Sequence, residues 1–300
     1  MTETFTIAHL TDVHLSPVAG FTPRYWNLKR MAGLLNWHSK RRGVHSRAVA
    51  DLLVADAKAL RADHVVITGD LINLGLPAEY VSALEWLQAI GPPERVTVIP
   101  GNHDIYSSLH GDAGVTRWAA YMGGEAETLA FPFVRRFGPV ALIGLNSAVE
   151  TPPFAASGQL GPDQIEVTRD LLERLNDDDA IRVVLIHHPP LAGLTSARRA
   201  LKDVKLFQRM LEKTGAELVL YGHNHKPLLT WLETVNGPLA VIGGASASAA
   251  RLYKNDPLAQ YNLFTFFKSE EGLRIRQIVR GLERPDGPVV KLSERVLEKR

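Results

Sequence analysis

Short, nearly uninterrupted runs of apolar residues recur along the chain, and most of them end at a glycine or proline followed by polar residues. Runs of this length, bounded by turn residues, are typical of strands that are buried on both faces of a sheet. In the first three quarters of the chain they cover residues 5–10, 65–68, 96–99, 140–145, 182–186 and 218–221. Near the C-terminus the pattern predicts further strands over residues 239–242, 264–267 and 273–279.

Apolar residues recur at helical spacing between several of these runs, which predicts helices over residues 48–60, 79–89 and 163–175. Strands that alternate with helices indicate an α/β protein, in which ligands bind at the carboxyl ends of the strands. The hairpin-like strands near the C-terminus predict that part of the sheet is antiparallel. We expect one domain over residues 1–282, followed by a polar tail over residues 283–300.

The composition narrows the class of protein. A chain of 300 residues can bury most of its apolar surface without a disulfide or a structural metal. It contains no cysteine, which excludes disulfides, zinc–thiolate sites, iron–sulfur clusters and thiol nucleophiles. The formal net charge of +2 is too small to predict a nucleic-acid partner. The N-terminus lacks a signal-peptide pattern and no apolar run approaches the roughly 18 residues of a membrane span, so we expect a cytoplasmic protein.

Residues that bind metals or transfer protons follow most of the predicted strands. They are Asp12, His14, Asp70, Asn102, His103, Asp104, His187, His223 and His225. Pairs separated by one residue, such as Asp12 and His14, place both side chains on the same side of an extended segment. Two ligands of one pair can therefore converge on one ion.

Seven of these side chains form a ligand set without sulfur, comprising four imidazoles, two carboxylates and one amide oxygen. Such a set suits divalent Mn, Fe, Co, Ni or Zn. A single catalytic ion usually takes about three protein ligands and keeps a position open, so seven ligands are too many for one ion. They suit two ions that share a carboxylate, an arrangement that binds a phosphate and generates hydroxide at neutral pH.

The order of these motifs resembles that of the calcineurin-like metallophosphoesterases, and most closely that of bacterial cyclic-nucleotide phosphodiesterases and glycerophosphodiesterases. The matching motifs are Asp12-Val13-His14, Gly69-Asp70, Gly101-Asn102-His103-Asp104, His187 and Gly222-His223-Asn224-His225. The resemblance covers about residues 5–245 and implies a four-layer α/β sandwich, in which two mixed β-sheets pack face to face between helices. It also implies a phosphodiesterase that uses two divalent metal ions, Mn or Fe first, with Zn, Co, Ni or Mg as alternatives.

The resemblance further implies a role for each residue of the motifs. One ion is held by Asp12, His14 and His225, the other by Asn102, His187 and His223, and Asp70 bridges them. The residues alone do not distinguish His187 from His188, and the family pattern selects His187. His103 approaches the phosphate without binding metal, as proton donor or charge stabiliser for the leaving group. We expect Asp104 to hydrogen-bond His103 and orient it.

The remaining histidines and Tyr106 belong to none of these motifs. We expect the remaining histidines to lie on the surface or to pack against helices: His9, His38, His45, His64 and His110. Tyr106 either contributes to substrate binding in the cleft or has a packing role.

Residues 18–47 form a basic and aromatic insertion, and no acidic residue lies between Asp12 and Asp51. Apolar residues at helical spacing predict a basic amphipathic helix, with one face formed by Leu28, Met31, Leu34, Leu35 and His38. In one alternative the helix is a lid that recruits an anionic substrate through residues such as Arg41. In another it binds peripherally to the anionic inner face of the membrane. In the third alternative its apolar face packs on the domain and its charges are solvated.

The favoured function is hydrolysis of a P–O bond in a small nucleotide or glycerophosphodiester substrate, by attack of a metal-bridging hydroxide. The alternative is hydrolysis of a lipid-linked pyrophosphate of the UDP-diacylglucosamine type, which the insertion would suit. The near-neutral charge disfavours a nuclease, and the complete ligand set disfavours a non-catalytic scaffold. The sequence leaves the oligomeric state open.

Overall fold

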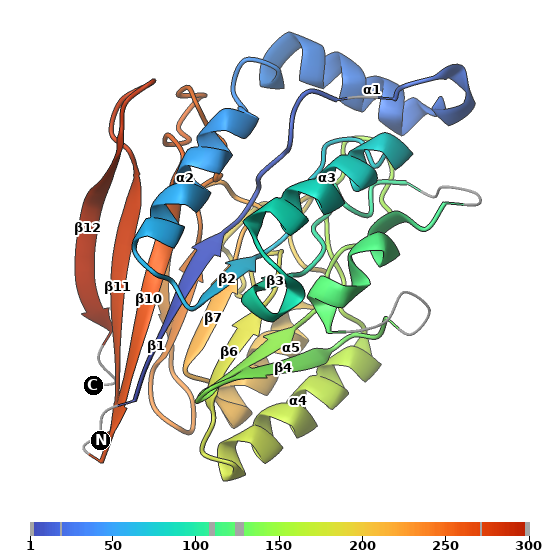
Figure 1. Cartoon of the computed structure of the whole chain (residues 1–300). Coiled ribbons are helices and arrows are strands. Elements are labelled where there is room, and N and C mark those ends of the chain that lie inside the picture. Colours follow the sequence, from blue (N-terminus) through green and yellow to red (C-terminus); the bar gives the residue numbers. More distant parts are fainter. Residues whose placement is uncertain (1–2, 19, 108–111, 124–128, 271, 298–300) are drawn as a thin grey trace.

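The computed structural model describes the chain except residues 1–2, 19, 108–111, 124–128, 271 and 298–300. The described strands form two six-stranded sheets, with helices on their outer faces (Figure 1). Both sheets contain parallel and antiparallel pairs. The predicted α/β sandwich of two mixed sheets is therefore confirmed.

The first sheet combines strands from the two ends of the chain. Its strands are β1 (Glu3–Leu10), β2 (His64–Ile67), β3 (Val96–Val98), β10 (Gln260–Ser269), β11 (Gly272–Leu282) and β12 (Val289–Leu297). They lie in the order β12-β11-β10-β1-β2-β3. Strands β1, β2 and β3 run parallel, so their carboxyl ends lie at one edge.

The second sheet is formed by the middle of the chain. Its strands are β4 (Phe133–Phe137), β5 (Val140–Gly144), β6 (Ile181–Leu185), β7 (Leu218–Tyr221), β8 (Leu228–Leu232) and β9 (Leu239–Gly243). They lie in the order β4-β5-β6-β7-β9-β8, with β5, β6, β7 and β9 parallel. This sheet therefore has a carboxyl edge of its own.

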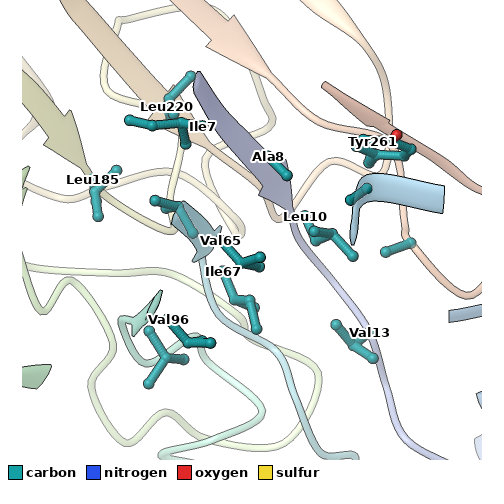
Figure 2. Close-up of a cluster of buried hydrophobic side chains, with 14 of the residues drawn as sticks. Ile7, Ala8, Leu10, Val13, Val65, Ile67, Val96, Leu185, Leu220 and Tyr261 are labelled. Carbon is teal, nitrogen blue, oxygen red and sulfur yellow. The ribbon is translucent and has the colours of Figure 1, made fainter. Parts of the chain in front are cut away.

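Two apolar cores hold the layers together. Alternate residues of the second sheet, such as Leu185 and Leu220, join Ile7 of the first sheet in a shared core, where Figure 2 shows them in one cluster. The intervening residues, such as Val184, face the core under helices α4 (Pro162–Asp177) and α5 (Val204–Thr214). Helices α2 (Arg47–Ala59) and α3 (Pro77–Ile90) pack on the first sheet through residues of the shared core. Because both faces of these strands are buried, their sequences show apolar runs rather than alternation.

The structure corrects two expectations about the secondary structure. Part of the segment expected to be a polar tail forms β12, which pairs antiparallel with β11. It reads as polar because it is an edge strand, and most of its side chains are exposed or half-buried. Helix α5 was not predicted, although Phe207, Met210 and Leu211 are buried at helical spacing.

The insertion forms helix α1 (Leu28–Asn36), which continues into a π-helical turn, η2 (Trp37–Arg41). Arg30 is buried beneath α1 and donates to three backbone carbonyls of neighbouring loops. By contrast, Leu28 is 83% exposed and Leu35 is 68% exposed. The alternative in which the apolar face packs on the domain therefore holds for Leu34, which packs against Leu74, Leu76 and Tyr106, and is wrong for Leu28 and Leu35. In the described part of the chain, no helix is both long and apolar enough to cross a bilayer.

Candidate metal centre

The predicted ligands converge where the carboxyl edges of the two sheets meet. The loops after β1, β2 and β3 supply Asp12, His14, Asp70 and Asn102, and the loops after β6 and β7 supply His187, His223 and His225. Six of these seven residues are buried, and the His225 side chain is 18% exposed. The structure thus brings together all seven ligands that the sequence predicted, although they span more than 200 residues of the chain.

One cluster consists of Asp12, His14 and His225. The Nε2 atom of His225 lies 3.2 Å from Asp12 Oδ1 and 3.2 Å from His14 Nε2. His14 Nδ1 donates a hydrogen bond to the carbonyl oxygen of Ile72, 3.2 Å away. This bond leaves the Nε2 lone pair of His14 directed at the other two ligands, as expected of a metal-binding imidazole.

The second cluster consists of Asn102, His187 and His223, and its three polar atoms also face one another. The Asn102 Oδ1 atom lies 2.8 Å from His223 Nδ1 and 3.2 Å from His187 Nε2. His187 Nδ1 donates to the carbonyl oxygen of Thr68 over 2.7 Å. Nε2 of His187 therefore faces the amide oxygen, as an N–H donor in the charged ring and as a lone pair available to a cation once that proton is lost.

The carboxylate of Asp70 lies between the two clusters. Its Oδ2 atom is 3.8 Å from His14 Nε2, and its Oδ1 atom is 3.4 Å from His187 Nε2. The backbone N–H of His103 donates to Oδ1 over 2.8 Å and fixes the orientation of the carboxylate. One oxygen thus faces each cluster, which is the arrangement needed for a carboxylate shared by two ions.

The local backbone holds these ligands in strained conformations. Asp12, Asp70 and His223 have φ angles of 50°, 55° and 69°, in the left-handed region that residues other than glycine seldom adopt. The preceding turns also require glycine, since a Cβ atom at Gly222 would lie 2.0 Å from Thr11 Oγ1, and one at Gly101 would lie 2.3 Å from Asp70 Oδ1. Strain of this kind persists where a site demands it, and the lack of space for a Cβ atom accounts for the glycine before His223 and the one before Asn102.

The electrostatics of the site favour bound cations. Burial lowers the pKa of His14 and His223 well below 6.5, which keeps both rings neutral as metal ligands must be. Although burial opposes the charged form of His187, the carboxylates of Asp70 and Asp12 raise its pKa to about 9. Among the described residues, Asp12 and Asp70 form ion pairs only with histidines. Buried carboxylates surrounded by imidazoles fit divalent ions, which would supply the compensating charge.

The structure corrects the expected partnership of Asp104 and His103. The Asp104 carboxylate is buried and accepts hydrogen bonds from the backbone N–H groups of Asp70, Ile72 and Gly101. His103 Nδ1 instead lies 2.5 Å from the carbonyl oxygen of Asn73. Neighbouring side chains on a tight turn point in different directions, so adjacency in sequence was misleading. Asp104 fixes the loops that carry the ligands and does not orient His103.

Arg41 contacts the other nitrogen of His103. Its Nη1 atom lies 3.1 Å from His103 Nε2, and because a guanidinium group can only donate, Nε2 accepts this hydrogen bond. Burial lowers the pKa of His103 to about 4, the nearby Asp70 opposes this shift, and Arg41 adds to it. His103 therefore carries its proton on Nδ1 and is neutral at pH 7.

Tyr106 and most of the other histidines lie away from the ligands. Tyr106 stacks behind His103, with ring centroids 5.5 Å apart, and packs against Leu74 and Leu76, which favours the packing alternative. Of the histidines expected on the surface or against helices, His38 is exposed, His9 and His64 are buried, and His110 lies outside the described residues.

His45 is the residue of the centre that the sequence analysis missed. It is buried, and its ring centroid lies 4.7 Å from that of His14 and 5.8 Å from that of His225. No motif surrounds His45 in the sequence, and long-range contacts, among them a bridge to Ala249, place it. The pattern of the chain therefore carried no local signal for this residue.

The ligands open into a cleft of about 580 Å³ with a strongly basic wall. Several of the ligands, together with His45 and His103, lie at its base. The positively charged side chains among its lining residues are Arg41, Arg199, Lys226, Arg251 and Lys254. Tyr253 adds an aromatic ring, and Asn36 at the end of α1 reaches the rim. Such a cleft attracts an anion that carries an organic group.

The comparisons with known proteins agree with this geometry. Residues 5–227 match the sequence model of the family described as calcineurin-like phosphoesterase. The chain is also 27% identical, over 229 residues and 75% of each protein, to a Synechococcus sp. protein described as a probable cyclic nucleotide phosphodiesterase.

Two solved structures share the fold at low sequence identity. A dimetal phosphatase from Danio rerio has a TM-score of 0.61 at 15% identity, and the similarity covers 96% of this chain and 98% of that one. A purple acid phosphatase from yellow lupin has a TM-score of 0.58 at 13% identity, and the similarity covers 99% of this chain and 54% of that one.

Proposed function

Because the chain belongs to the calcineurin-like phosphoesterase family, we propose that it is a two-metal phosphodiesterase acting on a nucleotide or glycerophosphodiester substrate. The observation that carries the proposal is the Asp70 carboxylate, whose two oxygens each face one three-ligand cluster. Retention of every ligand argues against a non-catalytic scaffold. The choice of a diester rests on the similarity to the cyanobacterial protein and on the open, basic cleft.

Each cluster would hold one divalent ion. In this assignment Asp12, His14 and His225 bind one ion, and Asn102, His187 and His223 bind the other, with Asp70 shared. When bound, the ions would polarise the phosphate and make hydroxide available at neutral pH. The nitrogen- and oxygen-only ligand set favours Mn or Fe, with Zn, Co, Ni or Mg as alternatives.

Arg41 and His103 would act together on the phosphate and leaving group. Arg41 brings a permanent positive charge into the cleft, where it can stabilise the charge that develops on the phosphate oxygens. His103 accepts the Arg41 hydrogen bond and is itself held by the Asn73 carbonyl, so it orients the guanidinium. This arrangement favours charge stabilisation over proton donation as the role of His103 in the free protein.

A second candidate function is hydrolysis of a lipid-linked pyrophosphate. The observation that favours it is the exposed apolar stripe of α1, which includes Leu28 and Leu35, on a helix whose last residue, Asn36, lines the cleft. Trp26, just before the helix, is 58% exposed and could contact an acyl chain or an anionic membrane surface. A cytoplasmic location, peripheral attachment at the inner membrane face and a possible oligomer stay predictions.

The test is a substrate panel applied to protein stripped of metal and reloaded with one divalent metal at a time. Bis(p-nitrophenyl) phosphate, cyclic nucleotides, glycerophosphodiesters and lipid-linked pyrophosphates would be compared with monoesters of the same alcohols. We expect metal-dependent turnover that is highest for a diester. Highest turnover of the lipid-linked pyrophosphate would select the second candidate, and absence of turnover for every substrate and metal would contradict both.

A further inference from the structure

His45 lies against the cluster of Asp12, His14 and His225, although it comes from the end of the insertion. Ligand atoms of His14, His45 and His225 all lie within 4.8 Å of one another. Ligands of one ion at metal–nitrogen distances of about 2.1 Å can be no more than about 4.2 Å apart, so a small inward movement would allow all three to bind. His45 also lines the cleft and is therefore accessible from it.

The surroundings of His45 match those of the histidines already assigned as ligands. His45 Nδ1 lies 2.8 Å from Ser248 Oγ, just as the Nδ1 atoms of His14 and His187 face backbone carbonyl oxygens. When the Ser248 hydroxyl accepts from Nδ1–H, the bond fixes the ring and leaves the Nε2 lone pair free, which is the usual support of a metal-binding histidine. Ser248 is fully buried, so the support is part of the core and not a surface contact.

The backbone on either side of His45 is tied to the loops of the metal centre. The carbonyl oxygen of His45 accepts a hydrogen bond from Ser16 Oγ over 3.0 Å. The N–H of Ser46 donates to the carbonyl oxygen of Ser248 over 2.9 Å, and the N–H of Ala250 donates to that of Val44 over 2.8 Å. These bonds place His45 between the loop after β1 and the loop after β9, so its position does not depend on the exposed helix α1.

We propose that His45 is an additional ligand of the ion held by Asp12, His14 and His225. The inference rests on the proposed function, because it requires that this cluster binds metal. Counting the shared Asp70, the first ion would have three imidazoles and two carboxylates, whereas the second would have two imidazoles, one carboxylate and one amide. The centre would then be asymmetric, with the second ion keeping more positions open for a substrate phosphate.

The proposal assigns a second purpose to the insertion. Both Arg41 and His45 belong to its last residues and line the cleft. Arg41 ends the π-helical turn η2, and His45 forms the bridge to Ala249. Turns with π-helical geometry are frequent at functional sites, where an extra residue redirects side chains. The insertion would thus complete the metal centre in addition to covering it.

The test is the binding of Co²⁺ to metal-stripped full-length protein, followed by visible absorption and by metal analysis after dialysis. We expect wild type to bind two Co²⁺, and His45→Ala to bind one of them at least about 10-fold more weakly, with a changed absorption spectrum. Ser248→Ala, which keeps the imidazole and removes its support, should weaken the same ion to a smaller extent. His38→Ala is the matched control, because His38 is exposed on the same segment, and it should bind as wild type does.

Two results for His45→Ala would overturn its assignment as a ligand. Wild-type affinity and spectrum in folded His45→Ala, with folding checked by circular dichroism of the metal-free protein, would overturn the proposal. A rise in KM with unchanged metal binding would also overturn it, by making His45 a substrate contact. If His45→Ala does not fold, His45→Gly with added imidazole replaces it, and the spectrum should shift toward that of wild type only when imidazole is present. Failure of wild type to bind two Co²⁺ would contradict the proposed function instead.

Discussion

The metal centre and the insertion lie side by side, yet they differ in burial and in what holds them in place. In the metal centre, buried side chains follow parallel strands and are fixed by backbone hydrogen bonds and strained turns. In the insertion, α1 leaves Leu28 and Leu35 exposed and is anchored by the buried Arg30 and by Leu34, which packs against a small apolar cluster. The fold thus holds the reactive groups rigidly. The insertion beside them presents exposed side chains that a partner or substrate can contact. The contrast predicts different effects for substitutions in the two regions.

The largest effect is expected from Asp70→Asn, because Asp70 is the residue that joins the two clusters. The amide offers only one oxygen, so both ions should bind more weakly and diester hydrolysis should fall by more than ~10³-fold. Folding should persist, since the core of a chain this long does not depend on bound ions. Metal analysis and turnover of bis(p-nitrophenyl) phosphate measure the effect, and near-normal turnover in a metal-free variant would rule out a shared carboxylate.

A smaller but still large effect is expected at the pair that links the two regions. His103→Ala should retain both ions and lose roughly 10²–10³-fold in kcat, the usual contribution of a positioned group that stabilises charge in the transition state. Arg41→Ala should lose a similar amount if the two residues act as a unit, and the double variant should lose little more than either single one. If Arg41 and His103 stabilise charge on the leaving group, the loss of kcat in these variants should be smaller for substrates with good leaving groups.

The control for this pair is metal content. Loss of an ion from His103→Ala would show that His103 is a ligand, contrary to the assigned role. Fully additive effects of Arg41→Ala and His103→Ala would show that the 3.1 Å contact between them has no part in the reaction.

The rigidity of the metal centre can be tested at a matched pair of glycines. A Cβ at Gly222 would meet Thr11 Oγ1 at 2.0 Å and Asp12 Oδ2 at 2.6 Å, whereas a Cβ at Gly43 in the insertion would meet nothing within 4 Å. Gly222→Ala should therefore lower the free energy of unfolding by about 1–3 kcal/mol and weaken metal binding, because the Asp12 loop must shift. Gly43→Ala should change neither by much. Equal effects of the two substitutions on thermal unfolding would contradict the contrast between the regions.

The sequence revealed the candidate ligands because each lies in a turn soon after a strand, so a local pattern is enough to identify it. His45 was missed because long-range bonds to the loops after β1 and β9 bring it to the cluster. Strand β12 was read as a tail because an edge strand can be polar on its exposed face. The prediction that Asp104 hydrogen-bonds His103 was wrong, because adjacent side chains on a tight turn point in different directions. Local chemistry was thus predictable, whereas pairing across the fold was not.

The smallest effects on small substrates are expected from the exposed face of α1. Leu28 and Leu35 contribute little to the core, so Leu28→Asp with Leu35→Asp should change the free energy of unfolding by no more than about 0.5 kcal/mol for each site. Turnover of bis(p-nitrophenyl) phosphate should stay within about two-fold, since nothing in that reaction requires an apolar contact outside the cleft. The exposed Arg42 and Arg24 are the residues to reverse in charge, because reversing the buried Arg30 would break the anchor of the helix.

If the stripe receives a lipid, the same apolar substitutions should raise KM for a lipid-linked pyrophosphate and reduce binding to vesicles of anionic phospholipid. Arg24→Glu with Arg42→Glu should do so mainly at low salt, since charges on the surface are screened beyond about 8–10 Å near physiological ionic strength. Trp26→Ala should add to the loss if its ring inserts among acyl chains. Unchanged kinetics and unchanged vesicle binding in all these variants would leave α1 as a support for Arg41, with no partner on its outer face.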